Sequence, residues 1–270
     1  MTVEVRRSFV AVPDGTIHVA QAGSGPPVLL LHQTPRSWDE YRDVLPVLAE
    51  RFHAVAMDTI GFGDSSKPPW PDTIERWAAV AVSLLDALGI DRASVVGHHT
   101  GAVIAMEIAA GFPDRVDKLV LSAPAMVDDE HRRLYGDKPP VDEVERKLDG
   151  SHLVELWSMR APFYPPSIDL LERFVIDALK AGDRAGGGHT VVARYEMEPR
   201  LPLIKAPTLI VKPTEDPFAR PEAEKLAPHL PHARLVDLPG GMIPAPDQLP
   251  EEFASVVMAF LDEPAVGEGS

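Results

Sequence analysis

The sequence predicts an α/β fold, in which a mostly parallel, twisted sheet carries helices on both faces and a helical segment is inserted. Three observations predict it. Short apolar runs alternate with stretches whose apolar residues recur at helical spacing, which is typical of βαβ units. The apolar run 93–96 leads through a tight turn into a helix over 100–111 that is rich in alanine. From about residue 126 to 205 this alternation stops, and the segment is charged, aromatic and helix-prone.

The elements before the tight turn alternate regularly. Pro13, Asp14 and Gly15 form a turn sequence between two strand-like runs, which predicts a hairpin. The predicted elements are strands over 6–12, 16–21 and 27–32, a helical stretch over 38–50, a strand over 53–57, a helix over 72–88 and a strand from residue 93. The helix over 100–111 and a strand over 115–121 follow.

The second half of the chain returns to the sheet after the inserted segment. We expect strands over 206–211 and 233–238 and a closing helix over 250–261. Within the insertion, Gly186, Gly187 and Gly188 predict a break between helices. The predicted organisation is therefore a core domain of residues 1–125 and 206–270, interrupted by a helical cap over 126–205.

Composition limits the classes of function. The 270 residues, 45% hydrophobic and 25% charged, are those of an ordinary globular domain. The formal charge of −15 argues against nucleic acid and anionic membranes as partners, since both need a basic face. The absence of cysteine excludes disulfides, thiolate zinc sites and a cysteine nucleophile. Without a signal-peptide core or a long apolar run, we expect a cytoplasmic protein with a small-molecule substrate, and we allow for a homodimer.

One motif carries most of the functional information. Residues 95–102 read VVGHHTGA, and they resemble the nucleophile elbow of the α/β-hydrolase superfamily, in which Gly-X-Ser-X-Gly forms a strained turn between strand and helix. Gly97 and Gly101 match both glycines of that motif. The strand ending at His32 and the stretch 58–66, DTIGFGDSS, resemble the same superfamily. This resemblance implies the α/β-hydrolase fold with a cap inserted after the strand that follows the elbow.

The chain departs from the superfamily pattern at two catalytic positions. His99 stands where the nucleophile is expected, and Met242 stands in the Pro-Gly-Gly-His-X-Pro pattern where the general base is expected. The acid is retained, because Asp216 follows the strand over 206–211 as the triad acid does. We therefore exclude a serine acyl-enzyme mechanism.

Two interpretations of His99 remain. It is either a packed histidine in an inactive site or a relocated general base. The second interpretation predicts a direct contact between His99 and Asp216, because Met242 leaves the space between them open. Asp128 or Asp129, after the preceding strand, could supply the carboxylate instead.

Further site residues follow from the resemblance and from the position of the cap. The backbone N–H groups of Thr34 and Thr100 occupy the positions of the superfamily's oxyanion donors. The predicted substrate-binding residues are Gln33, Arg36, His152, Trp157 and Met242, with Arg36 as a clamp for a carboxylate or enolate. Weaker candidates in the cap are Phe163, Tyr164, His189 and Tyr195.

The sequence thus predicts a cofactor-free enzyme that acts on a small, partly apolar carbonyl compound. We see no spaced cluster of histidines and carboxylates and expect no metal. The first predicted reaction is hydrolysis of an ester or lactone by water that His99 activates. Proton abstraction by the same residue, in a lyase or isomerase, is the alternative, and a ligand-binding protein without catalysis is the second alternative.

Overall fold

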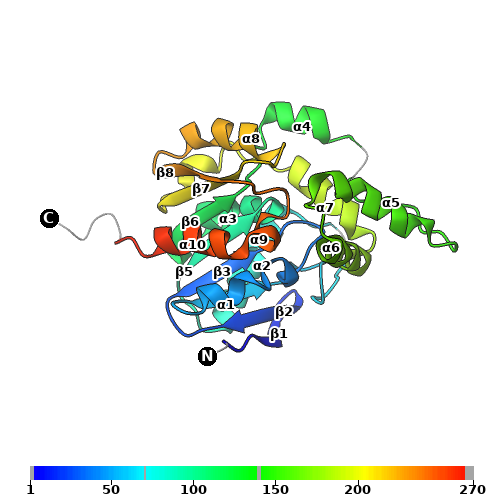
Figure 1. Cartoon of the computed structure of the whole chain (residues 1–270). Helices are drawn as coiled ribbons and strands as arrows, with labels where there is room; N and C mark the ends of the chain where they lie inside the picture. Colours follow the sequence, from blue (N-terminus) through cyan, green and yellow to red (C-terminus); the bar gives the residue numbers. More distant parts are fainter. Residues whose placement is uncertain (1–2, 70, 139–140, 265–270) are drawn as a thin grey trace.

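The computed structural model describes residues 3–69, 71–138 and 141–264 (Figure 1). Within these residues eight strands form one sheet in the order β1-β2-β4-β3-β5-β6-β7-β8. The strands are β1 (Arg6–Val12), β2 (Gly15–Ala22), β3 (Pro27–Leu31), β4 (His53–Met57), β5 (Ala93–His98), β6 (Val116–Ser122), β7 (Thr208–Pro213) and β8 (Ala233–Leu238). The two pairings that β2 makes are antiparallel, and the pairings from β4 to β8 are parallel. The predicted hairpin and the predicted mostly parallel sheet are confirmed.

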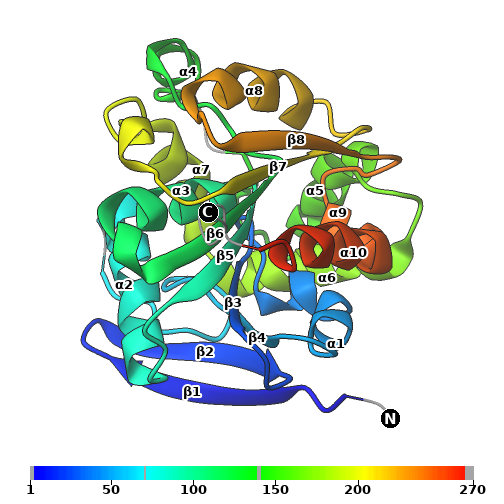
Figure 2. The ribbon, with the colours of Figure 1, turned by 90° about the vertical axis from the view of Figure 1, so that its left-hand side faces the viewer.

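Helices cover both faces of the sheet (Figure 2). One face carries α2 (Ile74–Ala87) and α3 (Thr100–Gly111), and the other carries α1 (Val44–Leu48) and α10 (Pro250–Leu261). An apolar cluster lies on each face of the sheet. Strand β3 contributes Leu29 and Leu31 to the cluster under α2 and α3, and Val28 and Leu30 to the cluster under α1 and α10. Alternate side chains of a strand point to opposite faces, so a strand that is apolar throughout needs cover on both. None of the described helices is both long and apolar enough to cross a lipid bilayer.

A helical segment connects β6 to β7, where the insertion is predicted. Its helices are α4 (Asp129–Tyr135), α5 (Ser151–Arg160), the 3-10 turn η3 (Ala161–Phe163), α6 (Ile168–Ala181) and α7 (Arg184–Ala193). Helix α6 packs against α5 and α7, and α7 also contacts α3 of the core. The predicted break at the glycines is wrong, because Gly186, Gly187 and Gly188 lie inside α7.

Tertiary packing explains the glycines in α7. A Cβ atom at Gly188 would lie 2.6 Å from Cγ2 of Thr34, so α7 passes too close to this loop of the core for a side chain. Glycine is therefore used here for close approach and not for chain reversal.

The predicted helical stretch over 38–50 is also more broken than expected. It forms the 3-10 turn η1 (Trp38–Tyr41) and the short helix α1. The other helical elements are α8 (Ala219–Leu226), α9 (Ala245–Gln248) and the 3-10 turns η2 (Pro113–Arg115), η4 (Leu201–Leu203) and η5 (Ala227–His229). All the loops that carry candidate site residues follow the carboxyl ends of parallel strands, the edge at which ligands bind in open α/β sheets.

Candidate active site

The turn between β5 and α3 presents His99 on a strained backbone. Its φ of 47° and ψ of −113° lie in a region that L-residues rarely adopt. The two glycines of the motif have no room for a side chain, since a Cβ at Gly97 would lie 2.1 Å from the carbonyl oxygen of Gly101. A Cβ at Gly101 would lie 1.9 Å from the carbonyl oxygen of Leu31. The sequence around His99 is therefore built to force this turn, as an elbow requires.

The imidazole of His99 contacts the carboxylate of Asp216. Nε2 lies 2.7 Å from Oδ2 of Asp216, so the contact predicted from the sequence is present. The other carboxylate oxygen, Oδ1, accepts the backbone N–H groups of Phe218 and Ala219 at 2.9 and 3.1 Å. Burial raises the pKa of Asp216, but the His99 contact and the backbone hydrogen bonds outweigh it and lower the pKa to about 2. Asp216 is therefore a carboxylate with a fixed orientation.

The contact decides which nitrogen of His99 can act as a base. An ionised carboxylate only accepts hydrogen bonds, so Nε2 carries the proton and Nδ1 keeps a lone pair. The side chain of His99 is 21% exposed, whereas that of Asp216 is fully buried. In the part of the chain that the structure describes, no group is hydrogen-bonded to Nδ1 of His99. The pair thus offers one basic nitrogen supported by one carboxylate, which is the arrangement of a general base.

The alternative carboxylates are engaged elsewhere. Asp128 caps α4, where its Oδ1 accepts the backbone N–H of His131 at 2.8 Å. Asp129 is paired with Arg132. The structure thus pairs His99 with Asp216 and places both alternatives at the start of α4.

His98 points into the core, and its ring packs edge-to-face against that of His99, with centroids 4.7 Å apart. It is fully buried, its Nε2 donates to the carbonyl oxygen of Ile243 at 2.7 Å, and its Nδ1 accepts the hydroxyl of Ser122 at 2.9 Å. Burial lowers the pKa of His98 to about 3, so it stays neutral. Although Ser122 and His98 form a serine–histidine pair, both are inaccessible to solvent. The pair holds the elbow against the loop that carries Ile243.

Thr34 and Thr100 lie side by side, and Thr100 directly follows His99 in the sequence. Their hydroxyl oxygens are 3.0 Å apart. Both side chains are largely buried, and Gly188 of α7 lies directly against Thr34. Among the described residues, neither backbone N–H donates to another backbone carbonyl outside the regular elements. Two N–H groups near one nucleophile position are what an oxyanion hole requires.

The structure assigns Gln33 a partner inside the protein. Its side-chain Nε2 donates to Oε1 of Glu40 at 2.5 Å, and its backbone N–H donates to Oε2 at 2.9 Å. Both Gln33 and Glu40 are buried. The amide N–H that was expected to face a substrate is therefore committed to Glu40.

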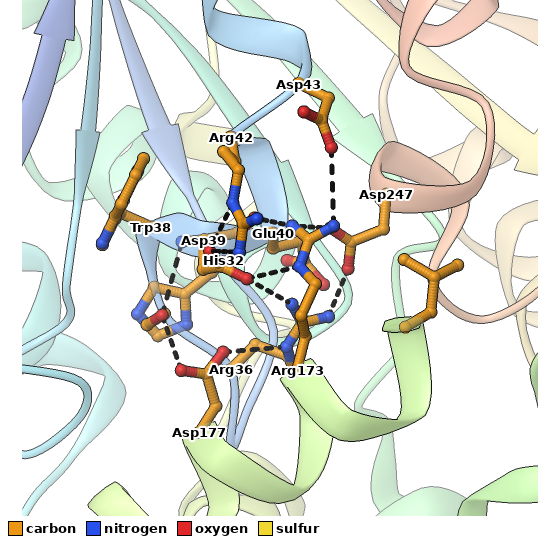
Figure 3. Close-up of polar contacts among 12 residues, drawn as sticks. His32, Arg36, Trp38, Asp39, Glu40, Arg42, Asp43, Arg173, Asp177 and Asp247 are labelled. Atoms are coloured by element: carbon orange, nitrogen blue, oxygen red, sulfur yellow. Dashed lines mark hydrogen bonds and ion pairs between the residues drawn. The ribbon is translucent and has the colours of Figure 1, made fainter. Parts of the chain in front are cut away.

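Arg36 is a correction to the sequence prediction. Its guanidinium is fully buried and pairs with Asp177 of α6 (2.9 Å), with Asp247 of α9 and with Asp39 (3.5 Å). Figure 3 shows Arg36 and Arg173 among these carboxylates. A guanidinium whose nitrogens already face three carboxylates has none left for a substrate anion, so the prediction of a substrate clamp is wrong. We call Arg36, Arg173, Asp39, Asp177 and Asp247 the charge cluster.

The cap residues His152 and Trp157 both lie on α5. His152 is in the first turn of α5, where its Nδ1 accepts the backbone N–H of Lys147 at 3.3 Å. Trp157 lines an apolar groove of about 630 Å³ between α5 and α6. The other residues of this groove are Leu153, Val154, Glu172, Val175 and Ile176. Neither contact involves His99 or Asp216, and the role of both residues in substrate binding stays a prediction.

Met242 lies in a loop that is bonded to the Asp216 loop. Its backbone N–H donates to Oε1 of Gln248 at 2.7 Å, and its side chain is half-buried. The backbone N–H of Glu215 donates to the carbonyl oxygen of Gly241 at 2.8 Å. The loops that carry the triad acid and histidine in the superfamily are thus neighbours here as well.

Sequence reasoning missed a second group of polar residues in the cap. His189 of α7 contacts Asp142, which is paired with Arg160 of α5. These residues are 18 and 47 positions apart in the sequence, so no motif or periodicity could have joined them. Only His189 was a candidate, and its partners were not.

One group in the described residues has ligands suitable for a metal ion. His18, Asp58 and Asp64 bring one ligand atom each to within 4.8 Å of one another, a cluster that the sequence spacing did not indicate. Arg7 already donates to His18 Nε2 and to Asp64 Oδ2, each at 3.1 Å, and Lys180 pairs with Asp64 at 2.9 Å. Cationic side chains therefore compensate this carboxylate in place of a metal.

Comparisons with known proteins bear on the fold of the chain. A family model described as the alpha/beta hydrolase fold matches residues 26–137. The haloalkane dehalogenase 2 of Mycobacterium tuberculosis is 28% identical over 262 residues, 90% of this chain and 91% of that protein. A soluble epoxide hydrolase from Corynebacterium sp. (strain C12) is 36% identical over 121 residues, 45% of this chain. That match spans 42% of the epoxide hydrolase, less than half of its length.

A solved structure resembles the whole chain. The hydrolase from Pseudomonas aeruginosa PA01 superposes with a TM-score of 0.77 at 25% identity, over 96% of this chain and 99% of that one. The strand order, the elbow between β5 and α3 and the helices between β6 and β7 agree with such a likeness. By its strand order and by these matches, the chain has the α/β-hydrolase fold.

Proposed function

We propose that this protein is a cofactor-free hydrolase in which His99 acts as a general base on water. The observation that carries the proposal is the 2.7 Å contact between the elbow imidazole and Asp216. A histidine that merely filled an inactive site would need neither a strained backbone nor an ionised partner. The substrate is a small, partly apolar ester or lactone.

The residues support one sequence of steps. Nδ1 of His99 takes a proton from water while the water oxygen attacks the carbonyl carbon and the C=O electron pair moves to oxygen. Asp216 stabilises the imidazolium that forms. The N–H groups of Thr34 and Thr100 stabilise the oxyanion. The intermediate then breaks its bond to the leaving oxygen, which must gain a proton.

The relatives favour hydrolysis over other reactions of the same base. The soluble epoxide hydrolase and the haloalkane dehalogenase are named for hydrolytic reactions. They also suggest a second substrate class, because water activated by His99 could open an epoxide ring at carbon. Proton abstraction from a substrate carbon, as in a lyase or isomerase, is the rival reaction. It would exchange a carbon-bound proton of the substrate for solvent deuterium, whereas hydrolysis would not.

The test compares three variants on a panel of esters, lactones and epoxides. We expect His99→Ala to lower kcat at least about 100-fold, and Asp216→Asn to lower it by a similar factor, since a positioned acid/base group contributes about 10²- to 10⁴-fold. His229→Ala, in exposed η5, is the matched control and should retain activity. Activity of His99→Ala within a factor of about three of the unaltered protein would remove His99 from the mechanism.

A further inference from the structure

Another histidine–aspartate contact, partly buried, lies in the cap. Nε2 of His189 is 2.9 Å from Oδ2 of Asp142, and Nε of Arg160 donates to Oδ1 of the same carboxylate at 2.8 Å. The side chain of Asp142 is fully buried, that of Arg160 is 9% exposed and that of His189 is 32% exposed. We call these three residues the cap cluster. Its most accessible member is the imidazole.

The cap cluster is anchored above both loops that flank His99. On one side, Gly188 precedes His189 on α7 and lies against Thr34, whose hydroxyl contacts that of Thr100. On the other side, Phe163 follows Arg160 by three residues and packs on Phe218, with ring centroids 5.4 Å apart. The backbone of Phe218 is in turn hydrogen-bonded to Asp216. Residues close to Arg160 and His189 in the sequence thus contact both the loop of Thr34 and the loop of Asp216.

The surroundings of His189 orient its ring. Asp142 has a φ of 66°, a conformation that costs energy for a residue with a side chain, and it is held there by two bonds from Arg160. Burial raises the pKa of Asp142, but Arg160 and His189 outweigh it and keep the carboxylate ionised. The ionised oxygen accepts the Nε2 proton of His189. Nδ1 is then the nitrogen that can meet a ligand.

We propose that His189 is a second catalytic residue, which in its imidazolium form donates the Nδ1 proton to the leaving oxygen of the substrate bound between it and His99 and keeps its Nε2 proton hydrogen-bonded to Asp142. This inference rests on the proposed function. When the carbon–oxygen bond breaks, its electron pair stays on the leaving oxygen, which takes the proton from His189. The proton that His99 took from water then goes to solvent as His189 regains one, so that the net change is addition of one water across the bond. Asp142 and Arg160 position the imidazole.

The first experiment tests the placement and does not depend on activity. The natural chain contains no cysteine, so two introduced thiols are the only ones present. We expect His99→Cys combined with His189→Cys to be cross-linked within one chain by a short bifunctional methanethiosulfonate. His99→Cys combined with His229→Cys, in η5 after α8, is the matched control and should not be cross-linked. A folded 99/189 pair that reacts no better than the control would overturn the inference.

The second experiment tests the chemical role. A proton donor matters most for leaving groups that are strong bases, so His189→Leu should lower kcat at least about 10-fold on alkyl esters and less than about 3-fold on p-nitrophenyl esters. His189→Gln, which keeps an N–H donor but cannot transfer its proton, should show the same contrast. Equal losses on both ester classes would assign His189 a structural role and contradict the proposal. If the unaltered protein hydrolyses neither class, the ester assignment fails, and the cross-link still decides whether His189 faces His99.

Discussion

The residues at positions 99 and 242 together determine which chemistry the elbow can support. The loops around Asp216 and Met242 are joined by the hydrogen bond from Glu215 to Gly241. A histidine at 242 would therefore stand beside Asp216, as the superfamily's triad requires. We expect His99→Ser combined with Met242→His to gain slow hydrolysis of p-nitrophenyl acetate with an initial burst. The variant should also become labelled by fluorophosphonates at position 99, while the natural activity is lost.

The single variants are the controls for this reconstruction. Serine at 99 without a base stays protonated, and a histidine at 242 beside His99 has no hydroxyl to activate, so neither should react. The natural protein should also remain unlabelled, because its buried pair of Ser122 and His98 is closed to reagents. Labelling of Ser122 by mass spectrometry, or a folded double variant that stays inert, would show that the site differs from the triad geometry.

Helix α7 is positioned by a contact that leaves no room for a side chain. Gly188→Ala places a methyl group 2.6 Å from Cγ2 of Thr34, so either the helix or the Thr34 loop must move. We expect a loss of about 1–3 kcal/mol in stability, typical of overpacking, and a fall in kcat because Thr34 is displaced. Denaturant titration and kinetics measure the two effects. Thr34→Ser removes the closest methyl group, and it should restore part of the stability when added to Gly188→Ala. Additive losses would mean that the two residues do not press on each other.

At the scale of the whole molecule, the charge cluster joins the cap to the core. Arg36, from the loop after β3, bonds to Asp177 of α6, and Arg173 of α6 bonds back to Asp39 and Asp247 (Figure 3). Glu40 lies beside this cluster. Burial raises its pKa from 4.5 to about 7, with Arg36 opposing the rise. Burial likewise raises the pKa of Asp247, to about 6.

These raised pKa values predict how stability depends on pH. Between pH 4.5 and about 7 the folded protein keeps a proton on Glu40 that the unfolded chain has lost, so stability falls as the pH rises. The loss from Glu40 is up to about 3 kcal/mol. We expect urea denaturation at pH 5 and pH 8 to show a smaller pH difference for Glu40→Gln than for the natural protein. Glu4→Gln, at an exposed position, is the control. An unchanged pH difference in Glu40→Gln would show that Glu40 is ionised throughout.

Local patterns in the sequence determined the alternation of strands and helices, the elbow and the position of Asp216. Apolar periodicity and the two elbow glycines act over a few residues, so they can be read without knowing the fold. The contact between His99 and Asp216, 117 positions apart, could be predicted because the superfamily's strand order brings these loops together.

Only the tertiary structure decided which polar residues have their partners inside the protein. The sequence predicts Arg36 as a substrate clamp, but its guanidinium is paired with Asp177 and Asp247, which are 141 and 211 positions away. The sequence predicts a helix break at Gly188, but this glycine is needed because Thr34 lies directly against it. The cap cluster left no trace in the sequence, because its members meet only when α5 and α7 both pack against α6. Pairing of charges and close approach of backbones are long-range events, and local composition does not encode them.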